Sequence, residues 1–231
     1  MELELLYEDN HIIAVNKPNG VLVHEDRTGD PSMEDFVKEY LKVKYAKPGN
    51  VYTQSVHRLD RPVSGVLILA KTSKGKERMA ALFKERKVKK TYWALSHAYP
   101  HEESGTIRQY LTKNRQRNIV SASDHPSEEA KYAETSFRLI GRGEPFYFFE
   151  LHPVTGRPHQ IRVMMKTIGS PILGDLKYGG EKINNPRAIL LHCRQIEFEH
   201  PVKHVPVTIT ADLPNVQAWH TVRHLLPANS V

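Results

Sequence analysis

One carboxylate stands among several potential cations in the stretch SVHRLDRPVSGVLILAKT, which covers residues 55–72. Asp60 lies between Arg58 and Arg61, and the apolar run Val66–Ala70 follows after a Pro and a Gly. A lone carboxylate in a low-dielectric site takes up a proton, whereas an arginine at hydrogen-bonding distance stabilises the anion and fixes its direction. The stretch therefore predicts an ionised carboxylate at the start of a buried strand, where it could act as a nucleophile or a base.

Three arginines could be the partner of this carboxylate. Arg58 and Arg61 are close to it in sequence, but each could equally well face a phosphate. Arg162 belongs to the segment RPHQIRVMMKTIG, where apolar residues recur at helical spacing and predict the buried face of a helix. His159, Arg162 and Lys166 would form a basic stripe beside that face, either as a solvated surface or as a site of phosphate or carboxylate contact. The residues alone do not choose among the three arginines.

Two further features could contact a substrate. A turn at Thr155 and Gly156 leads into the same helix and carries Arg157, so backbone N–H groups at the helix start could meet an anion. Tyr92 lies in the expected strand segment KKTYWAL, which also carries Lys90. A strand tyrosine usually serves packing, but its ring can also lie against a nucleobase.

Metal sites and nucleotide-cofactor sites are not indicated. The 13 histidines show no two pairs at zinc-site spacing, and the sequence has neither a Walker loop nor a dinucleotide fingerprint. His57 stands three residues before Asp60, which leaves a hydrolase as an alternative. That alternative lacks a Ser or Cys in a recognisable nucleophile setting.

The bulk composition is that of a globular protein with a basic surface. The 231 residues suffice for one large domain or two tightly joined lobes. Lys and Arg number 33 against 26 Asp and Glu, and the net charge of +7 favours a polyanionic partner such as nucleic acid. The apolar runs are too short to cross a bilayer, no secretion signal opens the chain, and the single cysteine, Cys193, fits a reducing cytosol. These features predict a cytoplasmic protein without membrane contact.

The expected elements include more strands than helices, and many strands are adjacent, so we predict an α+β fold around one mainly antiparallel sheet. Two strands are expected around a turn at Lys17–Gly20, and Ser32 is expected to cap the next helix. The polar residues 115–129 predict an exposed excursion. The other expected helices cover residues 73–88 and 157–169, and the other expected strands cover residues 66–71, 90–99, 105–114, 130–140, 145–154, 187–201 and 205–214.

Several of these stretches resemble, in order and spacing, the motifs of the RluA family of RNA pseudouridine synthases. The stretches that resemble the three core motifs are HRLDRPVSGVLILAKT, KKTYWAL and HPVTGRPHQIRVMMKTIGSPILGDLKYGG. The opening stretch YEDNHIIAVNKPNGVLVH resembles the first motif of the family, and AILLHCRQIEFEHP resembles its closing strand. The resemblance covers about residues 5–210. Val63 is a departure, since the family often has Thr there. The chain also begins directly at the first motif, so it is expected to lack the small N-terminal RNA-binding domain of many relatives.

The resemblance implies a single catalytic domain over residues 1–231 with the pseudouridine synthase fold, in which helices flank a mixed, mainly antiparallel sheet with a catalytic cleft. The family's essential aspartate falls on Asp60, its active-site tyrosine on Tyr92 and the basic partner of the aspartate on Arg162. Arg58 is implied to fill the space that a flipped nucleotide leaves in the RNA. No metal or organic cofactor is expected.

The implied function is the isomerisation of specific uridines to pseudouridine in structured rRNA or tRNA. Asp60 would act as nucleophile or base, and the resemblance leaves open whether it attacks the base, attacks the sugar carbon or removes a ribose proton. RNA is the expected partner, and a monomer without an obligate protein partner is expected. A catalytically silent RNA-binding module is a weaker alternative, because Asp60 and Arg162 are both present. The expected RNA-binding residues are Arg58, Arg61, Lys90, Arg157 and His159.

Overall fold

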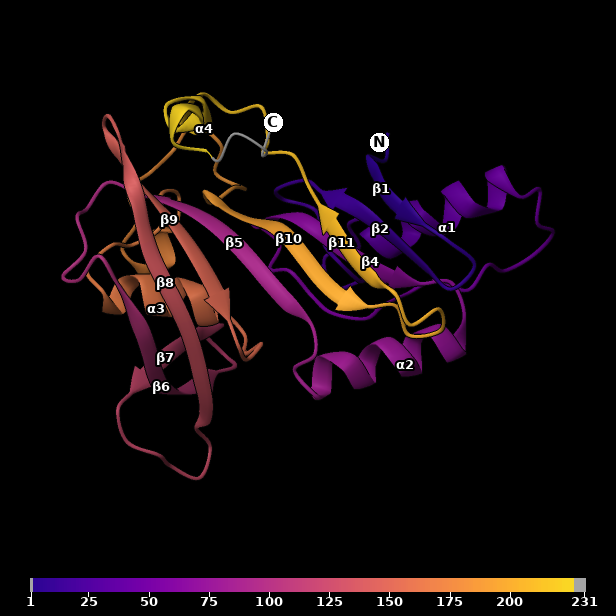
Figure 1. Cartoon of the computed structure of the whole chain (residues 1–231), viewed down its shortest axis with the longest axis horizontal. Coiled ribbons are helices and arrows are strands. Elements are labelled where there is room, and N and C mark those ends of the chain that lie inside the picture. Colours follow the sequence, from indigo (N-terminus) through magenta and orange to yellow (C-terminus); the bar gives the residue numbers. More distant parts are fainter. Residues whose placement is uncertain (1, 227–231) are drawn as a thin grey trace. The chain divides into compact units, whose positions relative to one another are not determined.

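The computed structural model describes residues 2–226, which fall into two compact units (Figure 1). Unit 1 contains the described residues up to Lys89 together with Cys193–Asp212. Unit 2 contains Lys90–His192 and the described residues from Leu213 onward. Each unit has its own set of paired strands and its own helices.

Unit 1 is built on strands in the order β1 (Leu5–Glu8), β2 (Ile12–Lys17), β4 (Ser64–Ala70) and β10 (Leu191–Glu199). Strand β2 pairs in the antiparallel sense with both β1 and β4. Two further strands extend the set, since β3 (Gln54–Ser55) pairs with β4 and β11 (Pro206–Thr210) pairs with β10. Every residue of β4 is buried, which confirms the interpretation of its apolar run as a core strand.

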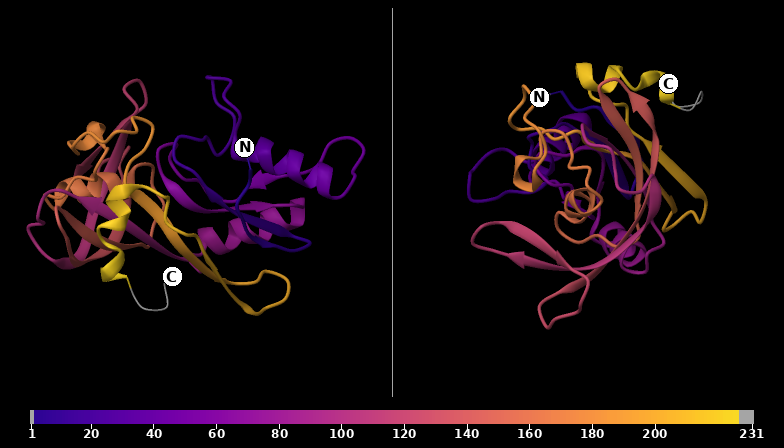
Figure 2. Two further views of the ribbon diagram at one scale, coloured as in Figure 1. Left: turned by 90° about the horizontal axis from the view of Figure 1, so that it is seen from above. Right: turned by 90° about the vertical axis from the view of Figure 1, so that its left-hand side faces the viewer.

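Two helices run beside the strands of unit 1, as Figures 1 and 2 show. Helix α1 (Met33–Lys44) begins after Ser32, whose hydroxyl accepts from the Asp35 N–H while the Asp35 carboxylate accepts from the Ser32 N–H. This reciprocal capping confirms the predicted N-cap and stabilises the helix start by about 1 kcal/mol. Helix α2 (Ser73–Lys84) begins after Thr72, whose hydroxyl caps the first turn, and it packs against β4.

Unit 2 carries antiparallel strands in the order β5 (Lys89–Ser96), β9 (Phe146–Pro153), β8 (Lys131–Gly143), β6 (Ser104–Asn114) and β7 (Ile119–Ser123). Helix α3 (Gln160–Thr167) packs against β7 and β8, and the 3-10 turn η1 (Leu176–Tyr178) packs against α3. The short helices α4 (Gln217–His220) and η2 (Arg223–Leu225) close the described chain. A core around Trp93, Phe148 and Trp219 joins β5, β9 and α4, and a second core that includes Val120, Val163 and Tyr178 joins β6, β7, β8, α3 and η1.

The structure differs from the sequence-based expectation at two places. The two N-terminal strands meet at a turn formed by the Asp9 carboxylate, which accepts from two backbone N–H groups, rather than at Lys17–Gly20. The residues that follow Gly20 form only an isolated bridge. The segment 115–129 was expected to be an exposed excursion without regular structure. It contains strand β7. Because β7 buries only Val120, its sequence carries too little apolar pattern to predict a strand.

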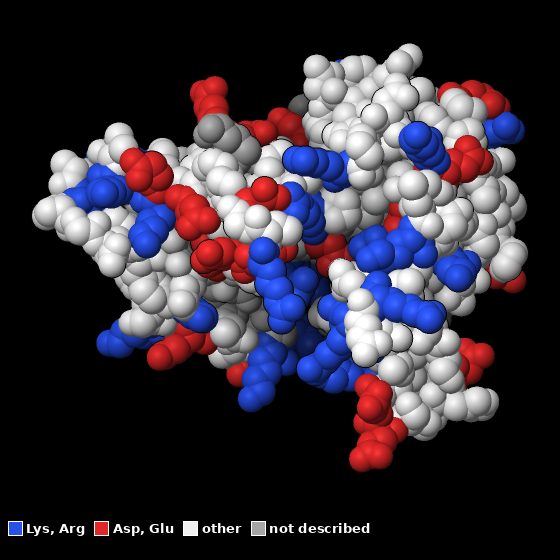
Figure 3. Space-filling model, turned by 180° about the vertical axis from the view of Figure 1, so that it is seen from behind, with Lys and Arg blue, Asp and Glu red and all other residues white. Residues whose placement is uncertain are grey.

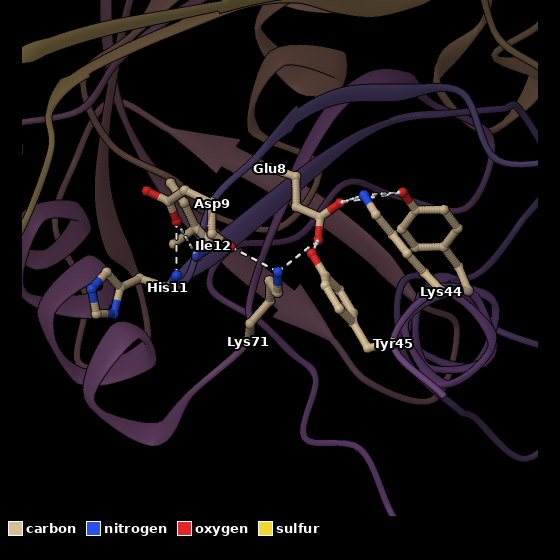
Figure 4. Close-up of polar contacts among 8 residues, drawn as sticks. Glu8, Asp9, His11, Ile12, Lys44, Tyr45 and Lys71 are labelled. Atoms are coloured by element: carbon tan, nitrogen blue, oxygen red, sulfur yellow. Dashed lines mark hydrogen bonds and ion pairs between the residues drawn. The ribbon is translucent and has the colours of Figure 1, made fainter. Parts of the chain in front are cut away.

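A polar cluster ties the β1–β2 turn to its neighbours in unit 1 (Figure 4). The Glu8 carboxylate accepts from the ammonium groups of Lys44 at 2.7 Å and Lys71 at 2.6 Å, and from the Tyr45 hydroxyl at 2.7 Å. Burial of Glu8 opposes its ionisation, but these three hydrogen bonds outweigh burial and lower the Glu8 pKa to about 2. The cluster therefore anchors β1 to α1 and to the end of β4.

The surface of the molecule is rich in cations. Figure 3 shows a face on which many Lys and Arg side chains gather, in keeping with the net charge of +7. Within residues 2–226, no helix is both long and apolar enough to span a membrane. A cationic surface of this kind attracts polyanions, because their binding releases condensed counterions.

Candidate active site

Asp60 lies in a turn of unit 1 that leads into β4. Its carbonyl accepts from the Val63 N–H at 3.0 Å, which closes the turn. A second turn clamps the next residue: the Gly20 N–H donates to the Arg61 carbonyl at 2.8 Å, and the Arg61 Nε donates to the Gly20 carbonyl at 2.9 Å. The Asp60 side chain is partly exposed. Asp60 therefore stands on a backbone that is held on both sides.

A buried lysine supports the same turn. Lys17, the last residue of β2, is fully buried and donates from Nζ to the carbonyls of Pro18 at 2.9 Å and Arg61 at 3.1 Å. Burial lowers the Lys17 pKa to about 7, while the charge of Asp60 opposes this lowering and the charge of Arg61 adds to it. Lys17 is therefore electrostatically coupled to Asp60, although its sequence position indicated only a turn.

Gly65 fixes the entry of this turn into β4. Its φ is 114°, a conformation that favours glycine, and a Cβ at this position would lie 2.3 Å from the Cys193 carbonyl oxygen. Strands β4 and β10 can therefore approach this closely only with glycine here. Any larger residue would push β4 away and would move the end of the Asp60 turn with it.

The two arginines beside Asp60 differ in their surroundings. Arg58 is exposed. Arg61 is partly buried, and its guanidinium forms an ion pair with Asp30 in addition to its bond to Gly20. Arg61 therefore holds two loops together. The RNA contacts expected of Arg58 and Arg61 stay predictions.

The contacts of His57 disfavour the hydrolase alternative. Its Nε2 accepts from the Ile68 N–H at 3.0 Å, and its ring stacks on Phe83 with 5.0 Å between the ring centres. A ring nitrogen whose lone pair accepts from a strand N–H cannot take a proton from a nucleophile without breaking that bond. His57 is therefore a supporting residue of β4 and α2.

In unit 2, Arg162 is buried and forms a bidentate ion pair. Its Nε and Nη2 donate to the two carboxylate oxygens of Asp175, each at 2.7 Å, and its guanidinium lies 5.1 Å from the centre of the Tyr178 ring. The side chains of Arg162 and Asp175 are 7% and 1% exposed. Two parallel hydrogen bonds fix a guanidinium in direction as well as in position. Asp175 lies in the stretch GDLKYGG, at the end of a segment that resembles a core motif, but it was not among the predicted site residues.

Tyr178 links this ion pair to the neighbouring strands. Its hydroxyl accepts from the Val120 N–H at 2.9 Å and lies 2.6 Å from the His159 Nδ1. His159 precedes α3 with a φ of 54°, which is uncommon for a residue other than glycine. The predicted basic stripe is therefore not one solvated surface, because Lys166 is exposed while His159 and Arg162 are buried. The RNA contact expected of His159 stays a prediction.

Side chains close the turn before α3. The Gln160 Oε1 accepts from the Thr155 hydroxyl at 2.7 Å and from the Arg157 N–H at 2.9 Å. The Arg157 Nε donates to the Tyr132 carbonyl at 3.0 Å, and the Lys90 Nζ donates to the Thr155 carbonyl at 3.5 Å. One of the N–H groups expected to meet an anion is thus bonded to Gln160. The RNA contacts of Lys90 and Arg157 stay predictions.

Tyr92 lies in β5, opposite Leu151 of β9, and is 8% exposed. Its neighbour Trp93 packs into the core of unit 2 and donates from Nε1 to Glu150 at 3.3 Å. Because successive side chains of a strand point to opposite faces, Tyr92 lies on the face away from that core. The position suits contact with a nucleobase, and this role stays a prediction.

The predicted site residues fall into two groups. Unit 1 holds Arg58, Asp60 and Arg61, and unit 2 holds Lys90, Tyr92, Arg157, His159 and Arg162. The pairing of Asp60 with Arg162 joins residues of different units and stays a prediction. Among residues 2–226, no group of three or more His, Cys, Asp and Glu side chains is arranged to hold a metal ion.

The sequence is similar to those of known RNA-modifying enzymes. A family model described as RNA pseudouridylate synthase matches residues 11–167, which include Asp60, Tyr92 and Arg162. The chain is 31% identical to tRNA pseudouridine synthase C of Vibrio parahaemolyticus, over 92% of this chain and 91% of that protein. It is 33% identical to ribosomal large subunit pseudouridine synthase C of Vibrio cholerae, over 92% of this chain and 67% of that protein.

The fold is similar to that of a solved human structure, RNA pseudouridylate synthase domain containing 4. The TM-score is 0.78 at 24% sequence identity, and the likeness covers 96% of this chain and 92% of the human chain. It confirms the predicted fold, with its mixed, mainly antiparallel strands and its helices.

Proposed function

Because this chain belongs to the family of RNA pseudouridine synthases of the RluA type, we propose that Asp60, Tyr92 and Arg162 carry out its isomerisation of uridine to pseudouridine. The reaction breaks the bond between the ribose C1′ and the uracil N1, turns the uracil, and joins C1′ to C5. A proton leaves C5 and one is gained at N1, so the composition of the RNA does not change. The proposal rests above all on the position of Asp60, a partly exposed residue on a turn clamped to Gly20.

Asp60 is the proposed nucleophile or base. Its turn is fixed by hydrogen bonds from two directions, so little reorganisation is needed when the uridine arrives. An ionised carboxylate could attack the uracil ring, attack C1′ or remove a ribose proton, and each route starts from the same position of Asp60. Lys17 lies beneath the turn, and the charge of Asp60 favours the protonated form of this lysine against its burial.

Arg162 is the proposed cationic partner of Asp60. A guanidinium has five N–H donors, and the two hydrogen bonds to Asp175 use two of them, so one arginine can serve two carboxylates. The pair with Asp175 supports the proposal because it holds the guanidinium rigid in a buried position. A rigid cation stabilises a carboxylate, or charge that develops on the base, without the cost of ordering a flexible side chain.

Tyr92 and Arg58 are proposed to handle the flipped nucleotide. A uridine within paired RNA must leave the stack before it can react, at a cost of a few kcal/mol. The Tyr92 ring offers a face for the flipped uracil, and its hydroxyl could take the proton from C5. Arg58, which is exposed, would fill the space left in the RNA. Arg61, Lys90, Arg157 and His159 are proposed to contact the phosphates around this site.

The RNA substrate is proposed to be ribosomal or transfer RNA. Two similar proteins are named for these RNAs, one as a tRNA pseudouridine synthase and the other as a ribosomal large subunit pseudouridine synthase. Comparing pseudouridine positions in total RNA from cells with and without this protein would identify the target. A position that is lost in the deletion and restored by the gene is the expected result.

We also propose that the two units work as one catalytic domain in a cytoplasmic monomer. The net charge of +7 supports direct binding of RNA without a protein partner, and a single cysteine suits a reducing compartment. Light scattering of the purified protein should give the mass of one chain, 26.5 kDa. A mass of two chains would contradict the monomer.

Asp60→Asn tests the catalytic proposal. The amide keeps the shape of the side chain but cannot act as nucleophile or base, so the variant should form no pseudouridine while it still binds RNA. RNA from cells that lack the protein serves as substrate, and pseudouridine is measured by chemical mapping. Asp124→Asn changes an exposed aspartate of unit 2 and should keep full activity. Turnover above background by pure Asp60→Asn protein would exclude Asp60 as the catalytic group.

A further inference from the structure

We propose that Leu176 is an RNA contact of unit 2, where its side chain packs against an unstacked base of the substrate. This inference rests on the proposed function, because it assumes an RNA substrate, and it adds a base-contacting residue that neither the sequence nor the family match assigned. Leu176 is 64% exposed, more than nearly every other large apolar side chain in the described chain. A single exposed leucine is common on protein surfaces, so its setting has to carry the inference.

The backbone of the turn that carries Leu176 is fixed by glycine conformations and backbone hydrogen bonds. Gly174 has a φ of 85°, and a Cβ on Gly180 would lie 1.9 Å from the Ile172 carbonyl oxygen. The Asp175 N–H donates to the Ile172 carbonyl at 3.0 Å, and the Gly180 N–H donates to the Asp175 carbonyl at 2.9 Å. An exposed leucine on so constrained a backbone is held in one place. It is therefore pre-organised for a contact, unlike a residue on a solvated loop.

The chain neighbours of Leu176 belong to the proposed active site. Asp175 forms the bidentate pair with Arg162, and the Tyr178 ring lies against the same guanidinium. Consecutive Cα atoms are about 3.8 Å apart, so Leu176 is displayed within one or two residue lengths of the groups that fix Arg162. A nucleotide next to the reacting uridine could reach it.

The charges around Leu176 favour RNA over a protein partner. Lys177 donates from Nζ to the Asn118 carbonyl at 2.8 Å, which joins η1 to the loop between β6 and β7. That loop carries Arg115 and Arg117, and both are exposed. An exposed apolar side chain that precedes Lys177, on a turn joined to a loop with two exposed arginines, matches a single-stranded nucleic acid, which offers a base face next to phosphates. The contact would add affinity for bases without selecting among them strongly.

Binding of two model RNAs tests the contact directly. One probe is an oligouridylate of about 12 nucleotides, and the other is an abasic ribose-phosphate chain of the same length and charge. All measurements use the Asp60→Asn background, so that the probe is not modified. Leu176→Ala should weaken binding of the oligouridylate about tenfold, which is the expected loss when most of a buried leucine is removed, and should leave binding of the abasic chain unchanged.

Two further variants test whether the effect is specific to the side chain at position 176. Leu176→Trp should bind the oligouridylate at least as tightly as the parent protein, because an indole ring stacks on bases better than leucine does. Val43→Ala is the matched control, since Val43 is 72% exposed on α1 of unit 1, and it should change neither affinity. Equal binding of the oligouridylate by parent and Leu176→Ala, or an equal loss with both probes, would overturn the base contact.

The failure of this inference can be told apart from failure of the proposed function. If the unchanged protein forms pseudouridine but Leu176→Ala binds the oligouridylate normally, only the base contact is wrong. If the unchanged protein forms no pseudouridine in RNA from deletion cells, the proposed function is wrong, whatever the binding shows. Weaker oligouridylate binding by Leu176→Ala, with unchanged binding of the abasic chain and recovery by Leu176→Trp, would establish that Leu176 contacts a base.

Discussion

Replacing Lys17 by Met removes a buried ammonium group whose pKa lies at about 7 instead of the ordinary 10.5. Below about pH 7, the folded protein must hold this charge in a desolvated position, which lowers its stability. Above about pH 10.5, the amine is neutral in both the folded and the unfolded chain. Between these values the unfolded chain binds more protons than the folded one, so the free energy of unfolding of the natural protein should rise with pH.

The size of this rise follows from the pKa difference. A change from 10.5 to about 7 is about 3.5 pKa units, and at about 1.4 kcal/mol per unit the upper limit is about 5 kcal/mol. Relaxation and water entry reduce such values, so we expect roughly 2 to 4 kcal/mol. Lys17→Met also removes the donor to the carbonyls of Pro18 and Arg61. That loss costs about 1 to 3 kcal/mol at every pH and therefore does not affect the slope.

Urea unfolding at several pH values between about 6 and 10 measures this effect. The quantity of interest is the difference in the free energy of unfolding between the natural protein and Lys17→Met, because all shared titrations cancel. Lys74→Met, which changes an exposed lysine of α2, is the matched control and should show a flat difference. A flat difference for Lys17→Met as well would refute the lowered pKa of the buried Lys17. We also expect this variant to lose catalytic rate, because the Asp60 turn loses its support.

Three other substitutions test separate parts of the structure. Asp175→Asn removes the carboxylate charge from the bidentate pair with the buried Arg162, so it should lower the free energy of unfolding by about 3 kcal/mol and the single-turnover rate by more than tenfold. An unchanged rate would show that the pair is only structural. Glu8→Gln should destabilise the protein by about 2 kcal/mol at neutral pH. The difference in free energy of unfolding between the two proteins should shrink as pH falls from about 4.5 to 2, because the Glu8 pKa is lowered to about 2. Unfolding measurements of both proteins in acid check this, and a constant difference would contradict the ionic cluster. Gly65→Ala should destabilise by at least about 3 kcal/mol in thermal unfolding, because its Cβ would lie 2.3 Å from the Cys193 carbonyl oxygen, whereas Gly156→Ala, which has open space, should be nearly neutral.

The sequence predicted well those features that depend on local pattern. The apolar run of β4 and the apolar positions of α3 both lie in the core, as their spacing indicated. The Ser32 cap was predictable because a capping hydroxyl and its acidic partner stand three residues apart. These signals need only neighbouring residues, so tertiary contacts do not overrule them.

Charged residues that the fold buries were not predictable in the same way. Lys17 stands in a sequence context that indicates a turn, and its burial depends on a carbonyl at residue 61, which is 44 positions away. Asp175 lies 13 positions from Arg162 in a glycine-rich stretch without periodicity. Lys and Asp are rarely fully buried, so only the assembled fold reveals that these two are. Disagreements of this kind between local pattern and fold are expected at functional sites.

The two buried charges share one physical arrangement. Each of the two charged groups that we propose for the chemistry is coupled to a buried group of opposite charge within its own unit: Asp60 to Lys17, and Arg162 to Asp175. Burying a charge is unfavourable unless a partner offsets it, so both supports cost stability that a plain apolar core would not. In return, the bidentate pair fixes the Arg162 guanidinium, and Lys17 holds the backbone of the Asp60 turn, before RNA arrives. Removing either support should therefore reduce the chemical step far more than the affinity for RNA, whereas loss of a surface arginine should do the reverse.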